Sequence, residues 1–226
     1  MSLQIIQTKD GSSSILNTGL NETYHSVHGA LQESRHVFIE HGLRYLSHKL
    51  NAPSLSVFEV GFGTGLNALL AAEFAEKNHV SVEYFSIETL PLPWEIATQL
   101  NYPPLLEWSP ASEIFERIHL SEWETRHHIT EFFSLKKVKG TIHNYTTPCT
   151  VDCIFFDAFA PDKQPEMWAP EILKKVTDAL NDRGVLVTYC AKGQLRRDLA
   201  ALDLKVEKLP GPPGKREMTR ASRNLD

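Results

Sequence analysis

Long apolar runs, cysteine pairs and metal-binding spacings are all missing from this chain of 226 residues. No apolar run approaches the ~20 residues of a membrane span, and the amino terminus has no signal-peptide core. Cys149, Cys153 and Cys190 form no C-x-x-C pair, which argues against a disulfide framework and a structural zinc site. We therefore expect a protein of the reducing cytoplasm that has no membrane segment.

The ten histidines lack the spacing of a metal site. His25 and His28 are three positions apart, and His127 and His128 are adjacent, but none has an H-E-x-x-H motif or a carboxylate at ligand spacing. We predict no bound metal. His25 instead either lines a pocket, as part of the loop that contains Tyr24, or lies on the surface.

Strand-like and helix-like segments alternate along the chain, which predicts an α/β fold with a mostly parallel sheet and helices on both faces. Expected strands cover residues 55–60, 82–87, 132–139, 151–156, 185–190 and 204–209, and expected helices cover 66–77, 105–126, 172–180 and 194–202, with another starting near Trp94. A hairpin over 3–17, with Asp10-Gly11 as a two-residue turn, and a helix over 30–46 precede them. The apolar positions of that helix fit a helical face only approximately.

These segments predict a single domain over residues 1–226. An N-terminal hairpin and helix extension occupies 1–50, and the core with a basic C-terminal segment occupies 51–226.

Three glycines spaced by single residues follow the apolar strand that ends at Val60. Such a strand, glycine turn and helix bring backbone amides close to a nucleotide-like ligand. A dinucleotide site of the form G-x-G-x-x-G needs its third glycine at position 66, which is Leu66. Here the glycines are Gly61, Gly63 and Gly65, and Glu59 precedes them. This E-x-G-x-G-x-G spacing favours S-adenosylmethionine over a nicotinamide dinucleotide.

Three acids fall where expected strands end, at the edge of the sheet where ligands bind. They are Glu59, Glu88 and Asp157. Glu88 lies 23 residues beyond Gly65, an interval that suits a carboxylate accepting bonds from both ribose hydroxyls; the alternative is a solvated loop acid. Asp157 precedes Ala-Phe-Ala-Pro and either orients an attacking amine at the reactive end of the ligand or caps a helix.

The chain is acidic overall, but its positive charge is concentrated near the C-terminus. The net charge is −5, yet residues 183–226 hold ten Lys or Arg against five Asp or Glu. Residues 210–220 read as a rigid loop that carries several of these cations. We predict that a basic face contacts nucleic-acid phosphates through Lys192, Arg196, Arg197, Lys215 and Arg216. A merely solubilising face would hold the same residues.

The motifs together resemble the methyltransferase part of the MnmC family, over nearly the whole chain. The matching segments are Glu-x-Gly-Phe-Gly-Thr-Gly-Leu-Asn at 59–67, Asp-Ala-Phe-Ala-Pro at 157–161, Glu-Met-Trp at 166–168, Gly-Pro-Pro-Gly-Lys-Arg-Glu-Met at 211–218, Glu-Thr-Tyr-His-Ser at 22–26 and Glu-Ser-Arg-His-Val-Phe at 33–38. The glycine motif is generic to class I methyltransferases, whereas the motifs at 157–161 and 211–218 are more specific.

The resemblance implies a Rossmann-like class I fold that uses S-adenosylmethionine to methylate the amine of 5-aminomethyl-2-thiouridine at the tRNA wobble position. It implies a cofactor site made of Tyr24, Glu59, Gly61, Phe62, Gly63, Thr64, Gly65, Asn67 and Glu88, with Asp157 at the reaction centre. The sequence departs from the family where an acid often lies near the adenine, because the neighbourhood here reads Lys139-Gly140-Thr141. It also lacks the FAD-dependent oxidase module of bifunctional members, so we expect a standalone methyltransferase whose aminomethyl-tRNA comes from another enzyme.

Three alternatives stay open. A methyltransferase of small molecules would use the same glycine turn without needing the basic segment. A NAD-dependent dehydrogenase is disfavoured by Leu66. A non-catalytic tRNA-binding protein would keep the fold and bind cofactor without transferring methyl.

Overall fold

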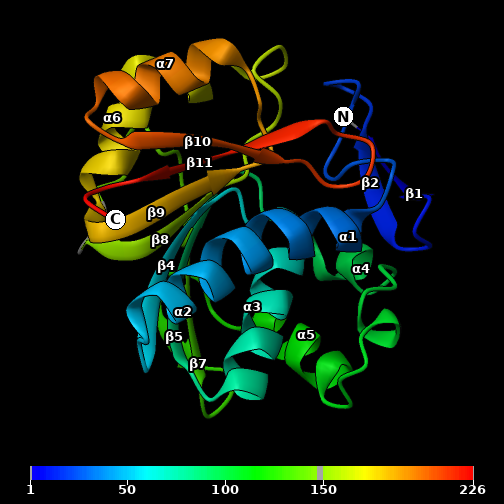
Figure 1. Ribbon diagram of the computed structural model, residues 1–226. Helices are drawn as coiled ribbons and strands as arrows, with labels where there is room; N and C mark the ends of the chain where they lie inside the picture. Colours follow the sequence, from blue (N-terminus) through cyan, green and yellow to red (C-terminus); the bar gives the residue numbers. More distant parts are fainter. Residues whose placement is uncertain (1, 147–149, 226) are drawn as a thin grey trace.

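The computed structural model describes residues 2–146 and 150–225 and contains two sheets (Figure 1). The large sheet consists of β4 (Ser54–Val60), β5 (Ser81–Glu88), β6 (Arg126–His128), β7 (Phe133–Lys139), β8 (Val151–Phe156), β9 (Leu180–Thr188), β10 (Lys205–Pro210) and β11 (Glu217–Ser222). The small sheet consists of β1 (Leu3–Gln7), β2 (Ser13–Asn17) and β3 (Glu22–Thr23). Cys149 lies outside the described residues, and Cys153 and Cys190 are buried free thiols.

The helical segments are α1 (Ala30–Ser34), the π-helical η1 (Arg35–Arg44), α2 (Tyr45–Leu50), α3 (Leu66–Asn78), α4 (Trp94–Ala97), η2 (Pro103–Leu105), α5 (Ala111–Leu120), η3 (Pro165–Trp168), α6 (Pro170–Asp178) and α7 (Gly193–Ala201). The stretch from α1 to α2, together with α3 and α5, packs on one face of the large sheet, and α6 and α7 pack on the other (Figure 1). This confirms the prediction of helices on both faces.

The large sheet has the strand order β10-β11-β9-β8-β4-β5-β7-β6. The pairs β4–β5, β4–β8, β5–β7 and β8–β9 are parallel, whereas β6 and β11 run antiparallel to their neighbours. The prediction of a mostly parallel sheet is therefore confirmed. The chain leaves β4 for β5 on one side and returns to β8 on the other, so the strand order reverses at β4. A crevice at the carboxyl end of such a strand is where open α/β sheets bind ligands.

The long N-terminal helix is wound more loosely in its middle than an α-helix. The π-helical segment η1 buries Val37, Phe38, Ile39 and Leu43 against the sheet. A π-helix has a longer period than an α-helix, which explains why these positions fit an α-helical face only approximately. Gly42 allows close packing, because a Cβ there would lie 3.1 Å from both Phe155 and Val187.

Three segments differ from the sequence prediction. The connection between β1 and β2 spans residues 8–12 rather than two residues, because Gln7 pairs with Ser13. The helix expected over 105–126 is confined to α5, and β6 follows it. The segment over 210–220 is a loop only as far as Arg216, because β11 then enters the sheet between β9 and β10.

Candidate functional site

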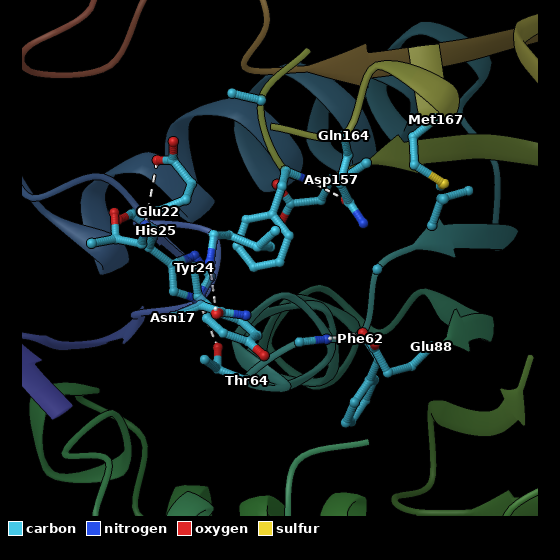
Figure 2. A pocket seen from close by; sticks show the side chains of 18 of the residues that line it. Asn17, Glu22, Tyr24, His25, Phe62, Thr64, Glu88, Asp157, Gln164 and Met167 are labelled. Carbon is cyan, nitrogen blue, oxygen red and sulfur yellow. Dashed lines mark hydrogen bonds between the residues drawn. The ribbon is translucent and has the colours of Figure 1, made fainter. Parts of the chain in front are cut away.

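A cavity of about 720 Å³ opens at the carboxyl ends of β4, β5 and β8. Its wall includes the predicted residues Tyr24, Gly61, Phe62, Gly63, Thr64, Asn67, Glu88, Asp157 and Lys215. Figure 2 shows Glu88 and Met167 on one side of the cavity, Tyr24 and Glu22 on the other, and Asp157 between them. This volume lies in the range of small-molecule sites.

The glycine turn between β4 and α3 forms the floor of the cavity. Gly61, Gly63 and Gly65 have φ angles of 97°, 51° and 74°, which L-residues with side chains rarely adopt. A Cβ on Gly61 would lie 2.7 Å from the Asp157 carbonyl oxygen, and one on Gly65 would lie 2.8 Å from His119 Nε2. Gly61 thus lets β4 and β8 approach at the cavity, while Gly65 lies behind the wall and makes room for His119.

Replacing Gly61 with alanine is expected to lower the free energy of unfolding by about 1–3 kcal/mol, because the residue combines a positive φ with a backbone collision. It should also weaken cofactor binding by displacing the turn. Urea unfolding and calorimetric titration with S-adenosylmethionine measure the two effects. Gly140→Ala is the matched control for the stability measurement, since a Cβ there meets nothing within 4 Å. Equal stability of the two variants would contradict the prediction.

Glu88 is oriented by the backbone around it. Its Oε2 accepts a hydrogen bond from Gly63 N at 2.9 Å, and its Oε1 accepts one from Leu90 N at 2.9 Å. Each carboxylate oxygen keeps a further lone pair for a ligand. The carboxylate is therefore fixed beside the glycine turn in a position that suits a pair of ribose hydroxyls.

Asp157 follows β8 and faces the cavity. Its Oδ2 accepts a hydrogen bond from Asn67 Nδ2 at 2.8 Å, so the first turn of α3 fixes the carboxyl group. Burial raises the pKa of Asp157 to about 7, and the charge of Glu33 acts in the same direction, whereas Asn67 and Lys215 lower it. The segment after Asp157 begins no helix, since η3 starts only at Pro165, and Asp157 therefore caps none.

The N-terminal extension closes one side of the cavity. The Tyr24 ring meets Phe159 edge to face, with ring centroids 5.1 Å apart, and also packs over Gly63. His25 is buried and its Nε2 lies 2.7 Å from the Thr64 hydroxyl. Burial lowers the pKa of His25 to about 4, so the imidazole is neutral. The sequence left open whether His25 lines a pocket or lies on the surface, and the structure places it in the pocket wall.

Glu59 lies behind the cavity wall rather than in it. The side chain is fully buried within β4, and its Oε2 accepts a hydrogen bond from the Ser86 hydroxyl at 2.7 Å. The predicted cofactor contact of Glu59 is thus replaced in the structure by contacts inside the protein.

The five predicted tRNA-binding cations occupy three kinds of position. Lys215 enters the cavity, where its Nζ lies 2.5 Å from Glu33 Oε2 and 3.9 Å from the centre of the Tyr189 ring. Arg196 is 10% exposed and binds Glu217 and Thr219, which holds β11 in place. Lys192, Arg197 and Arg216 are exposed.

The sequence reasoning missed several residues of the wall. Glu33, Phe159, Met167 and Tyr189 line the cavity. Glu33, Phe159 and Met167 belong to motifs that were singled out, although none of the three was predicted as a site residue, and Tyr189 carries no local signal. Leu90, Gly140 and Ile142 line the side of the cavity near Glu88. They offer apolar contact in the neighbourhood where family members often have an acid near the adenine and this sequence has none.

Within the described residues, no cluster of three or more His, Cys, Asp or Glu side chains is arranged to hold a metal ion. None of the helices in the part of the chain that the structure describes combines the length and apolar character needed to cross a membrane.

Residues 105–224 match the model of a family described as "S-adenosyl-L-methionine-dependent methyltransferase". The chain belongs to this family. The methyltransferase is 28% identical over 207 residues to the tRNA 5-methylaminomethyl-2-thiouridine biosynthesis bifunctional protein MnmC of Methylobacillus flagellatus, an alignment covering 87% of this chain and 32% of that protein. It is 29% identical to the MnmC protein of Pseudomonas aeruginosa, over 92% of this chain and 33% of the relative. The chain thus spans about a third of the length of these relatives.

Solved structures agree with this placement. A crystal structure of MnmC2 from Aquifex aeolicus matches the methyltransferase with a TM-score of 0.81 and 28% identity, covering 100% of this chain and 72% of that one. Spermidine synthase from Thermotoga maritima matches with a TM-score of 0.57 and 15% identity, over 99% of this chain and 73% of that one, which shows a shared fold. These matches confirm the predicted Rossmann-like methyltransferase fold.

The residues of the cavity fit the cofactor of the family. A Cβ at Gly61 would collide with the chain, so the floor of the site stays at backbone level where a ligand can approach closely. Glu88 offers two fixed carboxylate oxygens at one end, and Asp157 offers a carboxyl group nearer the other. S-adenosylmethionine supplies a methyl group on a sulfonium, which is itself an excellent leaving group.

Proposed function

We propose that this methyltransferase transfers a methyl group from S-adenosylmethionine to the amine of 5-aminomethyl-2-thiouridine at the tRNA wobble position. The observation that carries the proposal is the position of Asp157, at the cavity wall between the glycine turn and the Tyr24–Phe159 aromatic pair. The relatives named for this tRNA modification, which are 28% to 29% identical, supply the acceptor.

In this proposal the glycine turn and Glu88 bind the cofactor. The backbone of Gly61 and Gly63, with the side chains of Phe62 and Thr64, forms the floor beneath it. Glu88 accepts hydrogen bonds from the ribose hydroxyls, and Leu90 and Ile142 give the adenine an apolar surface in place of an acid. Holding cofactor and acceptor in line supplies most of the catalysis, because the sulfonium needs little further activation.

The acceptor side of the cavity is acidic, which suits an amine. Glu22, Glu33 and Asp157 line it, and Lys215 is the one Lys or Arg among the described residues of the cavity wall. Asp157 accepts a hydrogen bond from the amine, keeps the nitrogen lone pair directed at the methyl carbon, and stabilises the ammonium product until solvent removes a proton. Tyr24 and Phe159 provide aromatic surface for the base, which has to leave the anticodon loop to reach the cavity.

The reaction is tested by mass analysis of tRNA nucleosides after aminomethyl-containing tRNA is incubated with protein and S-adenosylmethionine. A gain of one methyl group at the wobble base, absent when the tRNA lacks the aminomethyl group, supports the proposal. Equal activity on free nucleosides would favour a small-molecule methyltransferase. Cofactor binding without methyl transfer to any tRNA would favour a non-catalytic tRNA-binding protein.

We propose that residues 1–226 form one methyltransferase domain that acts in the cytoplasm.

The exposed cations Lys192, Arg197 and Arg216 are proposed to bind tRNA phosphates. Reversing the three charges is expected to weaken tRNA binding. It should also reduce the slope of log K against the logarithm of salt concentration by about 2, because each neutralised phosphate contributes about 0.7 to that slope. Binding titrations at several salt concentrations measure both. The matched control reverses the exposed cations Lys49, Arg117 and Lys174, which carry no proposed role. An unchanged salt slope in the first variant would contradict the assignment.

A further inference from the structure

Three buried polar atoms beneath the cavity have no hydrogen-bond partner: Glu59 Oε1, Asn67 Oδ1 and the Tyr84 hydroxyl. All three residues are shielded from solvent, with exposures of 0%, 3% and 0%. Unpartnered polar atoms are rare in protein interiors, because each loses its water without replacement. Three of them around one carboxyl group therefore call for a shared explanation.

Among the residues that the structure describes, no cation contributes to the pKa shift of Glu59. Ser86 and Tyr84 face it from β5, Asn67 faces it from α3, and Asp157 faces it from the end of β8. All of these groups are neutral or acidic. An ionised Glu59 would thus be a buried, uncompensated charge directed toward a second carboxylate, which is an arrangement that proteins avoid.

Asn67 lies between the two acids. Its Nδ2 donates to Asp157 Oδ2 at 2.8 Å, and its side chain also contacts the Glu59 carboxyl. The amide oxygen of Asn67 can only accept a hydrogen bond, and an ionised carboxylate can only accept one too. The amide can therefore donate to one acid and accept from the other only if the second acid carries a proton.

We propose that Glu59 is held as a neutral carboxylic acid that donates its proton to Asn67 Oδ1, which fixes the Asn67 amide and, through it, the Asp157 carboxylate. This one proton gives partners to both Glu59 Oε1 and Asn67 Oδ1. The Tyr84 hydroxyl then donates to the same carboxyl group, so all three unpartnered atoms are satisfied. Glu59 is a positioning residue that never touches the cofactor or the acceptor.

The net shift of the Glu59 pKa is in the direction that this arrangement needs. Burial is the largest cause that raises the pKa of Glu59 to about 8, and the charge of Asp157 adds to it, whereas hydrogen bonding by Ser86, Asn67 and Tyr84 opposes the shift. Burial also raises the pKa of Asp157, to about 7. The geometry assigns the proton to Glu59 rather than to Asp157, because Asp157 Oδ2 already accepts a hydrogen bond from Asn67 Nδ2 while Asn67 Oδ1 lacks a donor. The value of an ionised Asp157 to catalysis rests on the proposed function.

The protonation state is tested on the protein alone, without cofactor or tRNA. Infrared difference spectra at neutral pH should show the carbonyl band of a buried carboxylic acid, absent from Glu59→Gln. Glu73→Gln is the matched control, because Glu73 is a buried acid that pairs with Arg35 and Lys77 away from the cavity. The Glu73→Gln variant should keep the carbonyl band of the buried carboxylic acid. A spectrum without such a band, or a band that disappears only in Asp157→Asn, would overturn the proposal.

The positioning role is tested by single-turnover methyl transfer. Glu59→Gln keeps a donor for Asn67 and should retain most of the rate near pH 7, whereas Glu59→Leu should lose about 10-fold or more with little change in cofactor affinity. The rate of Glu59→Gln relative to the unsubstituted protein should rise above about pH 8, because glutamine cannot lose the proton. A ratio that stays constant with pH, or a parallel loss of cofactor affinity in Glu59→Leu, would refute the role. If the unsubstituted protein transfers no methyl to tRNA, the proposed function fails while the infrared result still decides the state of Glu59.

Discussion

Replacing Asp157 with alanine is expected to lower the single-turnover rate of methyl transfer about 100-fold or more, with little change in the dissociation constant of S-adenosylmethionine. Asp157 lies at the cavity wall and is fixed by Asn67 at 2.8 Å, so its removal frees the acceptor amine to leave the line of attack. Losing alignment of this kind typically costs about two orders of magnitude in rate. The cofactor keeps its contacts with the glycine turn and Glu88, which the substitution does not alter.

Rapid mixing of enzyme, cofactor and aminomethyl-tRNA measures the rate, and calorimetric titration measures the affinity. Asp182→Asn is the matched control, because Asp182 is exposed and binds only Asn224 among the interactions described. Normal turnover by Asp157→Ala would remove this residue from the mechanism. A loss of cofactor affinity as large as the loss of rate would instead make Asp157 a cofactor-binding residue.

The same carboxyl group predicts a pH dependence. Burial raises the pKa of Asp157 to about 7, and only the ionised form accepts a hydrogen bond from the amine at both oxygens. The rate of the unsubstituted protein relative to Asp157→Asn should therefore rise as the pH increases through about 7. Single-turnover rates of both proteins are measured across the pH range. Their ratio removes the effect of the ionisation of the acceptor amine, because that ionisation is the same with both proteins. A ratio independent of pH would show that Asp157 does not titrate in this range.

Replacing Lys215 with methionine is expected to lower the free energy of unfolding by about 3 kcal/mol, a value for a buried ion pair that loses one partner. Lys215 Nζ lies 2.5 Å from Glu33 Oε2, and the side chains are 30% and 7% exposed. Without Lys215, the buried Glu33 carboxylate would face Asp157, whose pKa the Glu33 charge already raises. The cost thus comes mainly from leaving a charge buried and unpaired.

Urea unfolding of the single variants Lys215→Met and Glu33→Gln and of their combination measures this coupling. The double variant should recover much of the lost stability, because it buries no unpaired charge. Lys174→Met is the matched control: the Lys174–Asp178 pair has a separation of 2.6 Å but side chains 61% and 58% exposed. Its loss should stay below about 1 kcal/mol. Equal effects of Lys215→Met and Lys174→Met would contradict the prediction.

Local patterns in the sequence were sufficient for the glycine turn and the parallel strands. Gly61, Gly63 and Gly65 specify the turn because each adopts a positive φ that other residues resist. Glu88 and Asp157 could be placed at the cavity because the carboxyl ends of parallel strands meet at one edge of the sheet. These features depend on neighbouring residues and on general rules of α/β topology.

The strand β11 could not be predicted from the residues that form it. It contains the polar residues Thr219 and Arg220 beside apolar ones. Yet it lies between β9 and β10 in the sheet, and its side chains are mostly buried. Arg220 is tolerated there because it pairs with Glu207 and lies over the Tyr45 ring. Such compensation is visible only when segments distant in the sequence are brought together.

Backbone preferences and the alternation of strand and helix are local properties, and they were enough to predict the α/β class, the glycine turn and the acids at the strand ends. Which charged groups belong to the cavity followed only from the packing of segments that are distant in the sequence. This packing paired Lys215 with Glu33, from opposite ends of the chain, and buried Glu59 behind the wall, against Ser86. The physical reason is that a charged side chain is defined by its burial and its partners, and both depend on residues far away in the sequence.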